Sequence, residues 1–327
     1  MNCMVAEENQ GIIKVIRESR MIFDTIIVGA GISGSYLSFV LKNTTKNILI
    51  IDKSRGVGGR MSTKPIGEDI VDYGCQYIKS KTDECSALIK SLEELGLVNQ
   101  IEIKKGEKVY ISPFGMNKIP QYLSRGVSVV TNEKVEKIKY QNKLWEIDTG
   151  SISLISKTLV LTMPMPQVEE LMVRCNIKID QLPNVEYSSF YTSTFVSNVH
   201  HLEEIIGSDD TFSWICNNKK KGLRNLNNVF TVNNSKIIKR RLIEKEDPEK
   251  KGFIAGKINE AGFNSIVKLN IHFWKYAFSS NQNNINYIFN SDTGLGICGD
   301  SFSVGRVDGA VRSAELLSRE LIRFLRS

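Results

Sequence analysis

The sequence predicts an α/β fold in which a parallel sheet covered by helices is joined to a second, β-rich unit. Three observations support this prediction. A strand, a glycine-rich turn, a helix and a second strand follow one another within residues 23–52; a Gly-Asp pair precedes an amphipathic helix within residues 299–324; and a β-rich stretch lies between them. The 327 residues are 41% hydrophobic and 24% charged, which is typical of a globular chain of about two domains.

Composition excludes several classes of function. The longest apolar runs, such as residues 158–163, are far shorter than the roughly 20 residues that a membrane-spanning helix needs, so we expect no membrane partner. The net charge of +7 is spread along the chain, apart from lysines 219–221 and a mixed-sign stretch at 236–251. Such a distribution gives little support to nucleic-acid binding and fits anionic small molecules better.

The six cysteines and three histidines form no metal-binding pattern. No two cysteines have Cys-x-x-Cys spacing, so neither a zinc ribbon nor a thioredoxin-like pair is indicated. His200, His201 and His272 have no ligand or nucleophile motif around them, so no metal is predicted. Residues 1–20 contain several charges and no apolar core of a secretory signal. We therefore expect reduced cysteines, a cytoplasmic location and a flexible extension at 1–20.

The strongest motif is Gly-Ala-Gly-Ile-Ser-Gly at residues 29–34. It follows an apolar, β-branched strand at 23–28 and precedes a helix-compatible segment at 35–42; a second strand at 47–51 then ends on Asp52. Strand, G-x-G-x-x-G, helix, strand and an acid about 20 residues further on are the full context of a Rossmann-type dinucleotide-binding unit.

Each part of this motif has a physical role. Gly29 allows the tight turn, Gly31 lets the backbone approach a pyrophosphate, and Gly34 lets the helix pack closely on the strand. The free N–H groups at the start of the helix face the phosphate charge, and Asp52 can accept ribose hydroxyls. The motif alone does not separate NAD from FAD.

The middle of the chain contributes mostly strands. A second glycine-rich loop with two arginines, residues 53–63, follows Asp52 directly. A helix is predicted at 82–97, and Gly96 is its expected stop. The other predicted elements are strands at 128–130, 135–138, 144–147 and 158–161, a helix at 166–175, β-rich segments at 187–196, 212–216, 228–233 and 267–273, and a loop at 279–286.

The C-terminal elements narrow the choice of cofactor. A short strand within 294–298 ends on Gly299 and Asp300, and a helix at about 308–324 has apolar positions at helical spacing. Together with the loop at 53–63, this arrangement resembles the FAD-binding fold of the amine oxidase and hydroxylase superfamily. There a Gly-Asp carboxylate meets the ribityl and phosphate region, and the next helix start points at the flavin pyrimidine, where it stabilises negative charge. The resemblance implies non-covalent FAD.

Within that superfamily the chain is similar to the renalase family, from about Ile22 to Leu325. The similarity rests on residues 72–77, 161–166, 187–191, 274–276 and 299–310, which occur in the same order. Cys75, where an alanine is usual, and the pair at 306–307 depart from the family pattern and put the substrate preference in question. The resemblance and the two glycine loops together imply these FAD contacts: Gly29, Gly31, Ser33, Gly34, Asp52, Lys53, Gly59, Arg60, Met61, Gln76, Tyr77, Val135 (whose backbone would face the adenine), Gly299, Asp300, Val307 and Ala310.

The resemblance also implies an activity. Renalase-like enzymes are FAD oxidases that take a hydride from 2- or 6-dihydro-NAD(P) to flavin N5, release NAD(P)+ and pass the electrons to dioxygen, giving hydrogen peroxide. The expected partners are therefore a dinucleotide substrate and O2. Hydride transfer from a dihydropyridine needs no acid or base from the protein, which has to position the ring and exclude water.

The candidate substrate contacts are few. Tyr187, Tyr191, Trp274 and Tyr276 could form an aromatic wall for a flat ring, or they could be core residues on a sheet face. The lysines at 219–221 with Arg224 could attract the phosphates of a dinucleotide, or they could form a solvated loop.

Three other functions and a domain division complete the predictions. A flavin amine oxidase or hydroxylase of the same fold would need a reactive lysine or NADPH. An FAD-binding protein without turnover would not be reduced by dihydronicotinamides, and an NAD dehydrogenase would be colourless.

We predict a discontinuous FAD-binding domain of residues 21–80, 121–165 and 287–327, and a substrate-binding domain of a β-sheet with helices from residues 81–120 and 166–286. The oligomeric state is left open.

Overall fold

A computed structural model describes most of the chain. The described residues are 11–14, 21–103, 106–179, 182–198, 206–207, 211–243, 245–263, 265–281, 285–302 and 305–327. Most of the predicted N-terminal extension, together with His200 and His201, lies outside the described residues.

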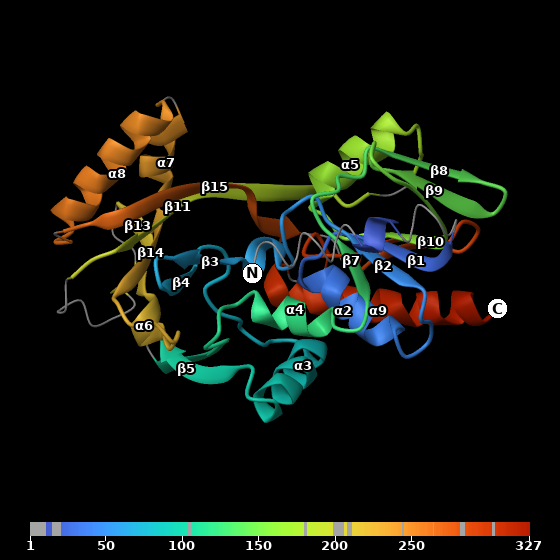
Figure 1. Cartoon of the computed structure of the whole chain (residues 1–327), viewed down its shortest axis with the longest axis horizontal. Helices are drawn as coiled ribbons and strands as arrows, with labels where there is room; N and C mark the ends of the chain where they lie inside the picture. The colour runs from blue at the N-terminus through green and yellow to red at the C-terminus, as the bar shows by residue number, and fades with distance from the viewer. Residues whose placement is uncertain are drawn as a thin grey trace.

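The first sheet contains eight strands and carries the predicted strand–helix–strand unit (Figure 1). Five of the strands run parallel in the order β17–β10–β1–β2–β7, and the other three extend the sheet in antiparallel pairs. The strands are β1 (Ile22–Val28), β2 (Ile48–Ile51), β7 (Ser128–Val130), β8 (Lys137–Gln141), β9 (Leu144–Asp148), β10 (Ser153–Leu161), β16 (Ile288–Asn290) and β17 (Leu295–Ile297).

Both faces of this sheet are buried, which explains why its strands read as continuous apolar runs. Ile26 and Val28 of β1 pack with α5 and the β8–β9 hairpin on one face, whereas Ile27 packs with α2 and α9 on the other. The helices and turns of the molecule are α2 (Ile32–Leu41), η1 (Gly59–Met61), α3 (Asp83–Glu94), α4 (Lys118–Leu123), α5 (Met165–Arg174), α6 (Asn218–Lys221), α7 (Lys236–Ile243), α8 (Asp247–Glu260) and α9 (Arg306–Arg326).

The second sheet is antiparallel, in the order β12–β13–β14–β11–β15. Its strands are β11 (Val185–Val196), β12 (Ile206–Gly207), β13 (Phe212–Asn217), β14 (Val229–Asn234) and β15 (Val267–Asn281). One face packs against α7 and α8 around Phe195 and Phe230. The opposite face meets the hairpin of β3 (Thr63–Ile66) and β4 (Asp69–Asp72), where the Thr231 hydroxyl donates to the Asp72 carbonyl at 2.7 Å.

The long strands β11 and β15 connect the two parts of the molecule. In Figure 1 they run from the α7–α8 side to α5, beside the first sheet. Val185 and Tyr187, at the start of β11, pack with the hydrophobic cluster that includes Ile26 and Val28 of the first sheet. Tyr191 and Phe195, further along β11, pack with the helices that cover the second sheet. In the part of the chain that the structure describes, no helix combines the length and apolar character required to cross a membrane.

Most predicted elements occur, with shifted ends. The predicted helix at 82–97 is α3, where the Thr82 hydroxyl accepts from the Cys85 N–H and Gly96 has a φ of +66° just after the helix end. Two predictions are wrong. Val135 precedes β8 rather than starting it, and Ser279 and Ser280 belong to β15 rather than to a loop, because β15 continues to pair with β11.

The division into two domains stays a prediction, and the packing of residues 81–120 bears on it. We assigned this segment to the substrate-binding domain. Its helices α3 and α4 pack with α2 and α9 around Met61, Leu88, Ile119 and Val311. The small hairpin of β5 (Asn99–Ile103) and β6 (Glu107–Ile111) continues from α3.

Candidate functional site: a glycine loop crossing beside an aromatic wall

The glycines of residues 29–34 meet three different requirements. At Gly29 φ is +115° and a Cβ would lie 2.4 Å from the Thr162 hydroxyl, so a side chain has neither the backbone geometry nor the space. At Gly34 a Cβ would lie 2.0 Å from the Gly29 carbonyl oxygen, which fixes the close approach of α2 to β1. At Gly31 nothing lies within 4 Å of the Cβ position. Gly31 therefore faces open space that a ligand can approach.

The start of α2 lies at the carboxyl end of the parallel strands. Its N-cap, Gly31, has no side chain to bond the first N–H groups, and no acidic residue occupies the first turn. Uncapped N–H groups at a helix start favour an anion there. The site lies at β1, where the strand order of the sheet reverses: the chain adds β2 on one side of β1 and later adds β10 on the other side. Open α/β sheets bind ligands at such a point.

The second glycine-rich loop crosses directly over the first. The Gly58 N–H donates to the Ala30 carbonyl at 2.9 Å, and a Cβ on Gly59 would lie 3.2 Å from the Gly31 Cα. We call this place the loop crossing, formed by residues 29–34 and 56–60. This place fits the pyrophosphate of a dinucleotide, because its backbone is open, the N–H groups at the start of α2 are uncapped, and no acidic side chain in the first turn would repel a phosphate.

Asp52 lies beside the loop crossing and holds it in place. One carboxylate oxygen accepts from the Ala30 N–H at 2.7 Å and the other from the Ser54 N–H at 2.7 Å. Lys53 is exposed and donates to the Gln167 side chain at 3.2 Å. The Asp52 carbonyl accepts from the Glu133 N–H at 3.0 Å, which places the segment before Val135 next to the same strand end.

Arg60 and Asp300, predicted to contact the cofactor, are paired with each other. They form a two-bond ion pair with one N–O distance of 2.6 Å, and the guanidinium also donates to the Tyr276 carbonyl at 3.1 Å. Burial alone lowers the pKa of Arg60, but the Asp300 carboxylate outweighs this and raises it. The pair connects the loop crossing to the strand end at Gly299, which has a φ of +151°.

The remaining predicted contacts from α2, η1 and α9 lie close together. The Ser33 hydroxyl donates to the Ala310 carbonyl at 3.4 Å, so the starts of α2 and α9 touch. Met61 is buried in the hydrophobic cluster against which Val307 is packed. The structure thus brings segments from both ends of the chain to one edge of the sheet, while contact of each side chain with a cofactor stays a prediction.

Gln76 and Tyr77 follow β4 and lie over the inner face of the second sheet. The Gln76 amide donates to the carbonyls of Asp72 and Gly74 at 2.7 and 3.1 Å, and the Tyr77 ring contacts Trp214 at 5.5 Å. Cys75 directly precedes Gln76. Burial, and after it the Asp72 charge, raises the pKa of the Cys75 thiol to about 11. Cys75 is therefore a neutral thiol at physiological pH.

The sequence did not reveal a buried ion pair behind this segment. The Lys221 ammonium contacts the Asp72 carboxylate at 2.7 Å, and the two side chains are 1% and 0% exposed. The same carboxylate accepts from the Met116 N–H at 2.9 Å. Lys221 therefore fits neither alternative for residues 219–221, because it is not in a solvated loop and is not free to contact a phosphate. The sequence shows only a run of three lysines, and nothing in that run distinguishes the lysine that the fold buries.

Three of the four predicted wall residues lie beside the loop crossing. The Tyr187 and Tyr276 rings meet edge to face at 5.5 Å, and the Tyr187 hydroxyl shares a 2.6 Å hydrogen bond with Ser301. Burial first and the Asp300 charge second raise the pKa of Tyr187 to about 12, so its hydroxyl stays protonated. The Trp274 indole donates to the Tyr73 carbonyl at 2.9 Å. We call Tyr187, Trp274 and Tyr276 the aromatic wall.

Of the two alternatives for Tyr191, a wall residue or a core residue, the structure supports the core position. Tyr191 is paired with Phe273 and Trp274 with Phe190, so Tyr191 and Trp274 point to opposite faces of the sheet. Tyr191 is 7% exposed and packs in the cluster formed with α7 and α8. It is a core residue of the second sheet. The sequence could not separate Tyr191 from the other three candidates, because the register of β11 and β15 shifts between Ser188 and Phe190.

Comparisons with known proteins define the class of fold. Residues 27–92 match the model of the NAD(P)-binding Rossmann-like domain. Over most of the chain, the fold is similar to that of solved structures of oxidases. It aligns with putrescine oxidase bound to putrescine at a TM-score of 0.69, with 14% identity over 93% of this chain and 99% of that one. It aligns with cyclohexylamine oxidase from Brevibacterium oxydans at a TM-score of 0.69, with 11% identity over 94% and 100%.

The chain is also similar in sequence to part of an individual protein. Putrescine oxidase from Kocuria rosea is 30% identical over 92 residues, which are 28% of this chain and 19% of that protein. The matched segment therefore spans about a fifth of the relative's length. The α/β fold with a Rossmann-type dinucleotide-binding unit is confirmed by these comparisons.

Proposed function

We propose that this chain is a renalase-like FAD-dependent oxidase of isomeric dihydronicotinamide dinucleotides, the 2- or 6-dihydro forms of NAD(P). The products would be NAD(P)+ and, with dioxygen, hydrogen peroxide. The proposal is supported by the fold, by the loop crossing and by the order of the motifs from residue 22 to residue 325.

The residues of the loop crossing fit FAD. Gly31 with open space around it, the uncapped start of α2 and the backbone of Gly59 would hold the pyrophosphate, and Asp52 would meet a ribose. When bound, FAD would supply a two-electron acceptor that takes a hydride from the dihydropyridine ring and returns the electrons to dioxygen. The protein's share of this chemistry is to bind, to orient the ring and to exclude water.

The observation that carries the choice of substrate is the balance of charge around the aromatic wall. The carboxylates of Asp72 and Asp300 are each paired with a cation. Cations lie near the rings of this region: Lys64 over Tyr73 at 4.6 Å, Lys275 over Tyr276 at 5.2 Å, Arg60 over Tyr187 at 6.0 Å and Arg306 over Phe278 at 6.0 Å. Such surroundings attract an anionic dinucleotide and repel a protonated amine.

Amine oxidation is the second candidate. It is favoured by the similarity to putrescine oxidase and cyclohexylamine oxidase in fold, and to putrescine oxidase in part of the sequence. An amine oxidase of this fold would need a reactive lysine, and Lys221 is a buried lysine whose ammonium lies 3.5 Å from the Gln76 side-chain oxygen. Its side chain is paired with the Asp72 carboxylate at 2.7 Å, however, and is not free to contact a substrate.

The two candidates are separated by anaerobic reduction of the flavin. The purified holoenzyme is mixed with 6-dihydro-NAD(P), with ordinary NADH and with putrescine, and the visible flavin band is followed. Rapid bleaching by the isomer alone, with peroxide formed when air is readmitted, is the expected result. Bleaching by putrescine alone would establish amine oxidation, and bleaching by none would overturn both candidates in favour of an FAD-binding protein without turnover.

A further inference from the structure

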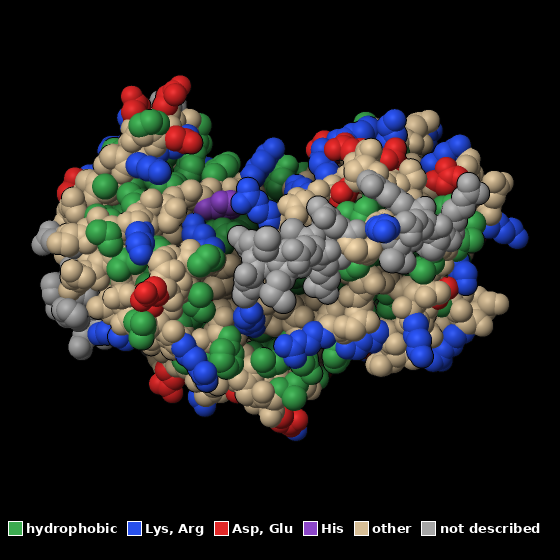
Figure 2. Space-filling view, viewed as in Figure 1, with side chains coloured by type: hydrophobic (Ala, Val, Ile, Leu, Met, Phe, Trp, Pro, Cys, Tyr) green, Lys and Arg blue, Asp and Glu red, His purple; other side chains and the backbone are tan. Residues whose placement is uncertain are grey.

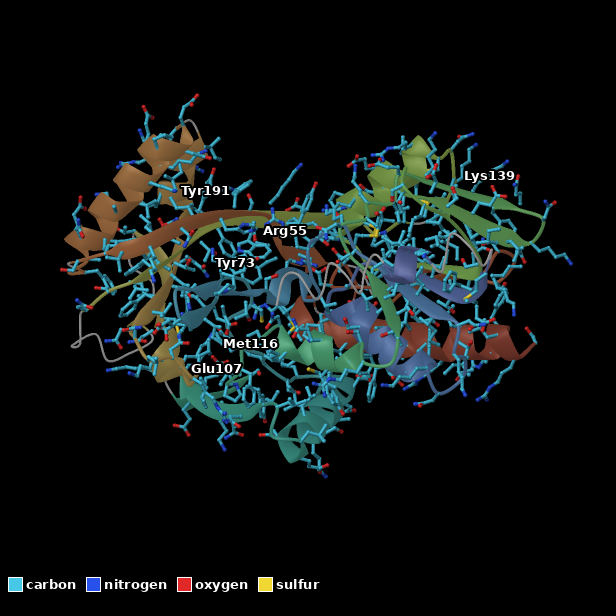
Figure 3. The ribbon with its side chains drawn as sticks, viewed as in Figure 1. Arg55, Tyr73, Glu107, Met116, Lys139 and Tyr191 are labelled. Carbon is cyan, nitrogen blue, oxygen red and sulfur yellow. The ribbon has the colours of Figure 1, made fainter. Side chains whose placement is uncertain are left out.

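A second group of side chains lies at the outer end of the aromatic wall. It consists of Lys64 on β3, Tyr73 after β4, and His272 with Trp274 on β15. The Tyr73 ring stacks on Trp274 at 5.4 Å and meets His272 edge-on at 5.2 Å, and His272 meets Trp274 at 4.3 Å. Figure 3 labels Tyr73 in the middle of the molecule, below β15. The three rings form one continuous aromatic surface.

Lys64 brings an uncompensated charge to this surface. Its ammonium lies 4.6 Å from the centre of the Tyr73 ring and forms no ion pair with any residue in the described ranges. The side chain is partly buried, and burial lowers the pKa of Lys64. A partly desolvated cation without a counter-ion is unfavourable by itself and gains most from an incoming anion.

His272 adds a hydrogen-bonding group that has no hydrogen-bond partner among the described residues. Its imidazole is partly buried. Burial and the Lys64 charge lower the pKa of His272, so the ring is neutral at physiological pH and keeps one N–H to donate. Figure 2 shows a histidine side chain at the surface, next to Lys and Arg side chains.

This group is connected to the loop crossing through Trp274. The Trp274 ring lies 3.2 Å from the position that a Cβ on Gly74 would take, and a Cβ there would also lie 2.1 Å from the Arg60 carbonyl oxygen. The Cys75 N–H donates to the same carbonyl at 2.8 Å. The aromatic surface therefore begins beside the proposed reaction site and ends at Lys64, so that one extended ligand could contact both.

We propose that Lys64 and His272, on the shelf formed by Tyr73 and Trp274, are the subsite for a phosphoryl group of the substrate. The inference rests on the proposed function for the identity of the substrate and goes beyond it in naming the residues that select its phosphorylated form. Lys64 supplies the charge, His272 an N–H donor, and the rings hold the ribose end of the molecule against the sheet.

Binding to the oxidised holoenzyme tests the subsite without turnover. The probes are nicotinamide mononucleotide and nicotinamide riboside, which differ only in the phosphoryl group. The wild-type protein is expected to bind the mononucleotide about tenfold more tightly, the size of a single charge-assisted hydrogen bond. Lys64→Met should remove this preference, Lys64→Arg should keep it, and Lys90→Met, which changes an exposed lysine on α3, should leave it unaltered.

The outcomes separate this proposal from the proposed function. Equal binding of the two probes to the wild-type protein, or equal weakening of both by Lys64→Met at unchanged FAD content and melting temperature, would overturn the subsite. If the isomeric dihydronicotinamides bleach the flavin while the probes bind equally, the function stands and the subsite fails. If no isomer bleaches the flavin but the mononucleotide preference depends on Lys64, the subsite stands and the function fails.

Discussion

At the scale of single residues, the loop crossing depends on what each glycine leaves room for. Gly29 and Gly34 are required by the protein itself, because a Cβ at either position would meet protein atoms at 2.4 and 2.0 Å. Gly31 has a φ of −77°, which any residue adopts, and no atom within 4 Å of its Cβ position. The open space at Gly31 therefore serves a ligand rather than the fold.

Gly31→Glu is expected to fold and to lose the cofactor. Its backbone geometry tolerates a side chain, but a carboxylate there would collide with the pyrophosphate and repel it by about 4 kcal/mol at 4 Å in an effective dielectric of about 20. That is almost three orders of magnitude in Kd. FAD content per chain and circular dichroism of the purified variant measure the two effects.

The control for this variant is Gly252→Glu. Gly252 lies on α8 with equally open space and should keep a full complement of FAD. Stoichiometric FAD in Gly31→Glu would show that the pyrophosphate does not lie at the loop crossing.

Residue roles that depend on local sequence could be predicted, and those that depend on distant partners could not. The spacing of Gly29, Gly31 and Gly34 carries its own geometry. Lys221 is 149 positions from Asp72, and nothing within the run of lysines distinguishes the one that the fold buries. Tyr191 is the same residue type as Tyr187 and lies four positions further along β11, but its side chain lies on the other face of the sheet.

At the scale of elements, side chains of the short helix α6 connect the second sheet to the β3–β4 hairpin. Lys221 at its end reaches Asp72, and the Asn218 side chain accepts from the Asp72 N–H at 3.3 Å. The Asp72 carbonyl in turn accepts from Gln76, which holds the segment that follows β4. The ion pair thus stabilises the contact between the hairpin and the sheet on which the aromatic wall is built.

Lys221→Met is expected to lower the free energy of unfolding by about 3–5 kcal/mol, because it leaves the Asp72 carboxylate buried without a counter-charge. Chemical denaturation of the holoenzyme measures the change. Lys219→Met, at an exposed lysine of the same helix, should alter stability by no more than about 0.5 kcal/mol.

A double variant checks the cause. In Asp72→Asn with Lys221→Met the charge is gone, and the amide oxygen can still accept from the Met116 N–H, so part of the lost stability should return. Equal stability of Lys221→Met and Lys219→Met would contradict the assignment of the ion pair to the contact between hairpin and sheet.

Elements with strong periodicity were predictable, and those shaped by tertiary pairing were not. The periodic apolar positions of α9 indicate a helix that covers a sheet, and the structure buries four of them: Val311, Ala314, Leu317 and Leu321. The helix α8 buries only Ile254 and Ile258, which are too few to form a visible apolar period in the sequence. Residues 236–251 therefore show only a mixed-charge pattern. β15 continues through polar residues because β11 lies beside it to receive its hydrogen bonds.

At the scale of the whole molecule, two sheets meet at one edge. The parallel sheet brings the loop crossing and the strand end at Gly299 together, and β11 with β15 carry the aromatic wall toward them (Figure 1). Arg60 connects the two parts, since it binds Asp300 on one side and the Tyr276 carbonyl on the other. A cofactor at the loop crossing would therefore lie against the wall.

The central claim is that this arrangement holds FAD, and the identity of the bound cofactor tests it most directly. The protein is purified, its visible spectrum is recorded, and it is denatured so that any non-covalent ligand is released and identified by chromatography and mass spectrometry. The account predicts a yellow protein that releases about one FAD per chain, with none left on the polypeptide. A colourless protein, or one that releases NAD in place of FAD, would contradict it.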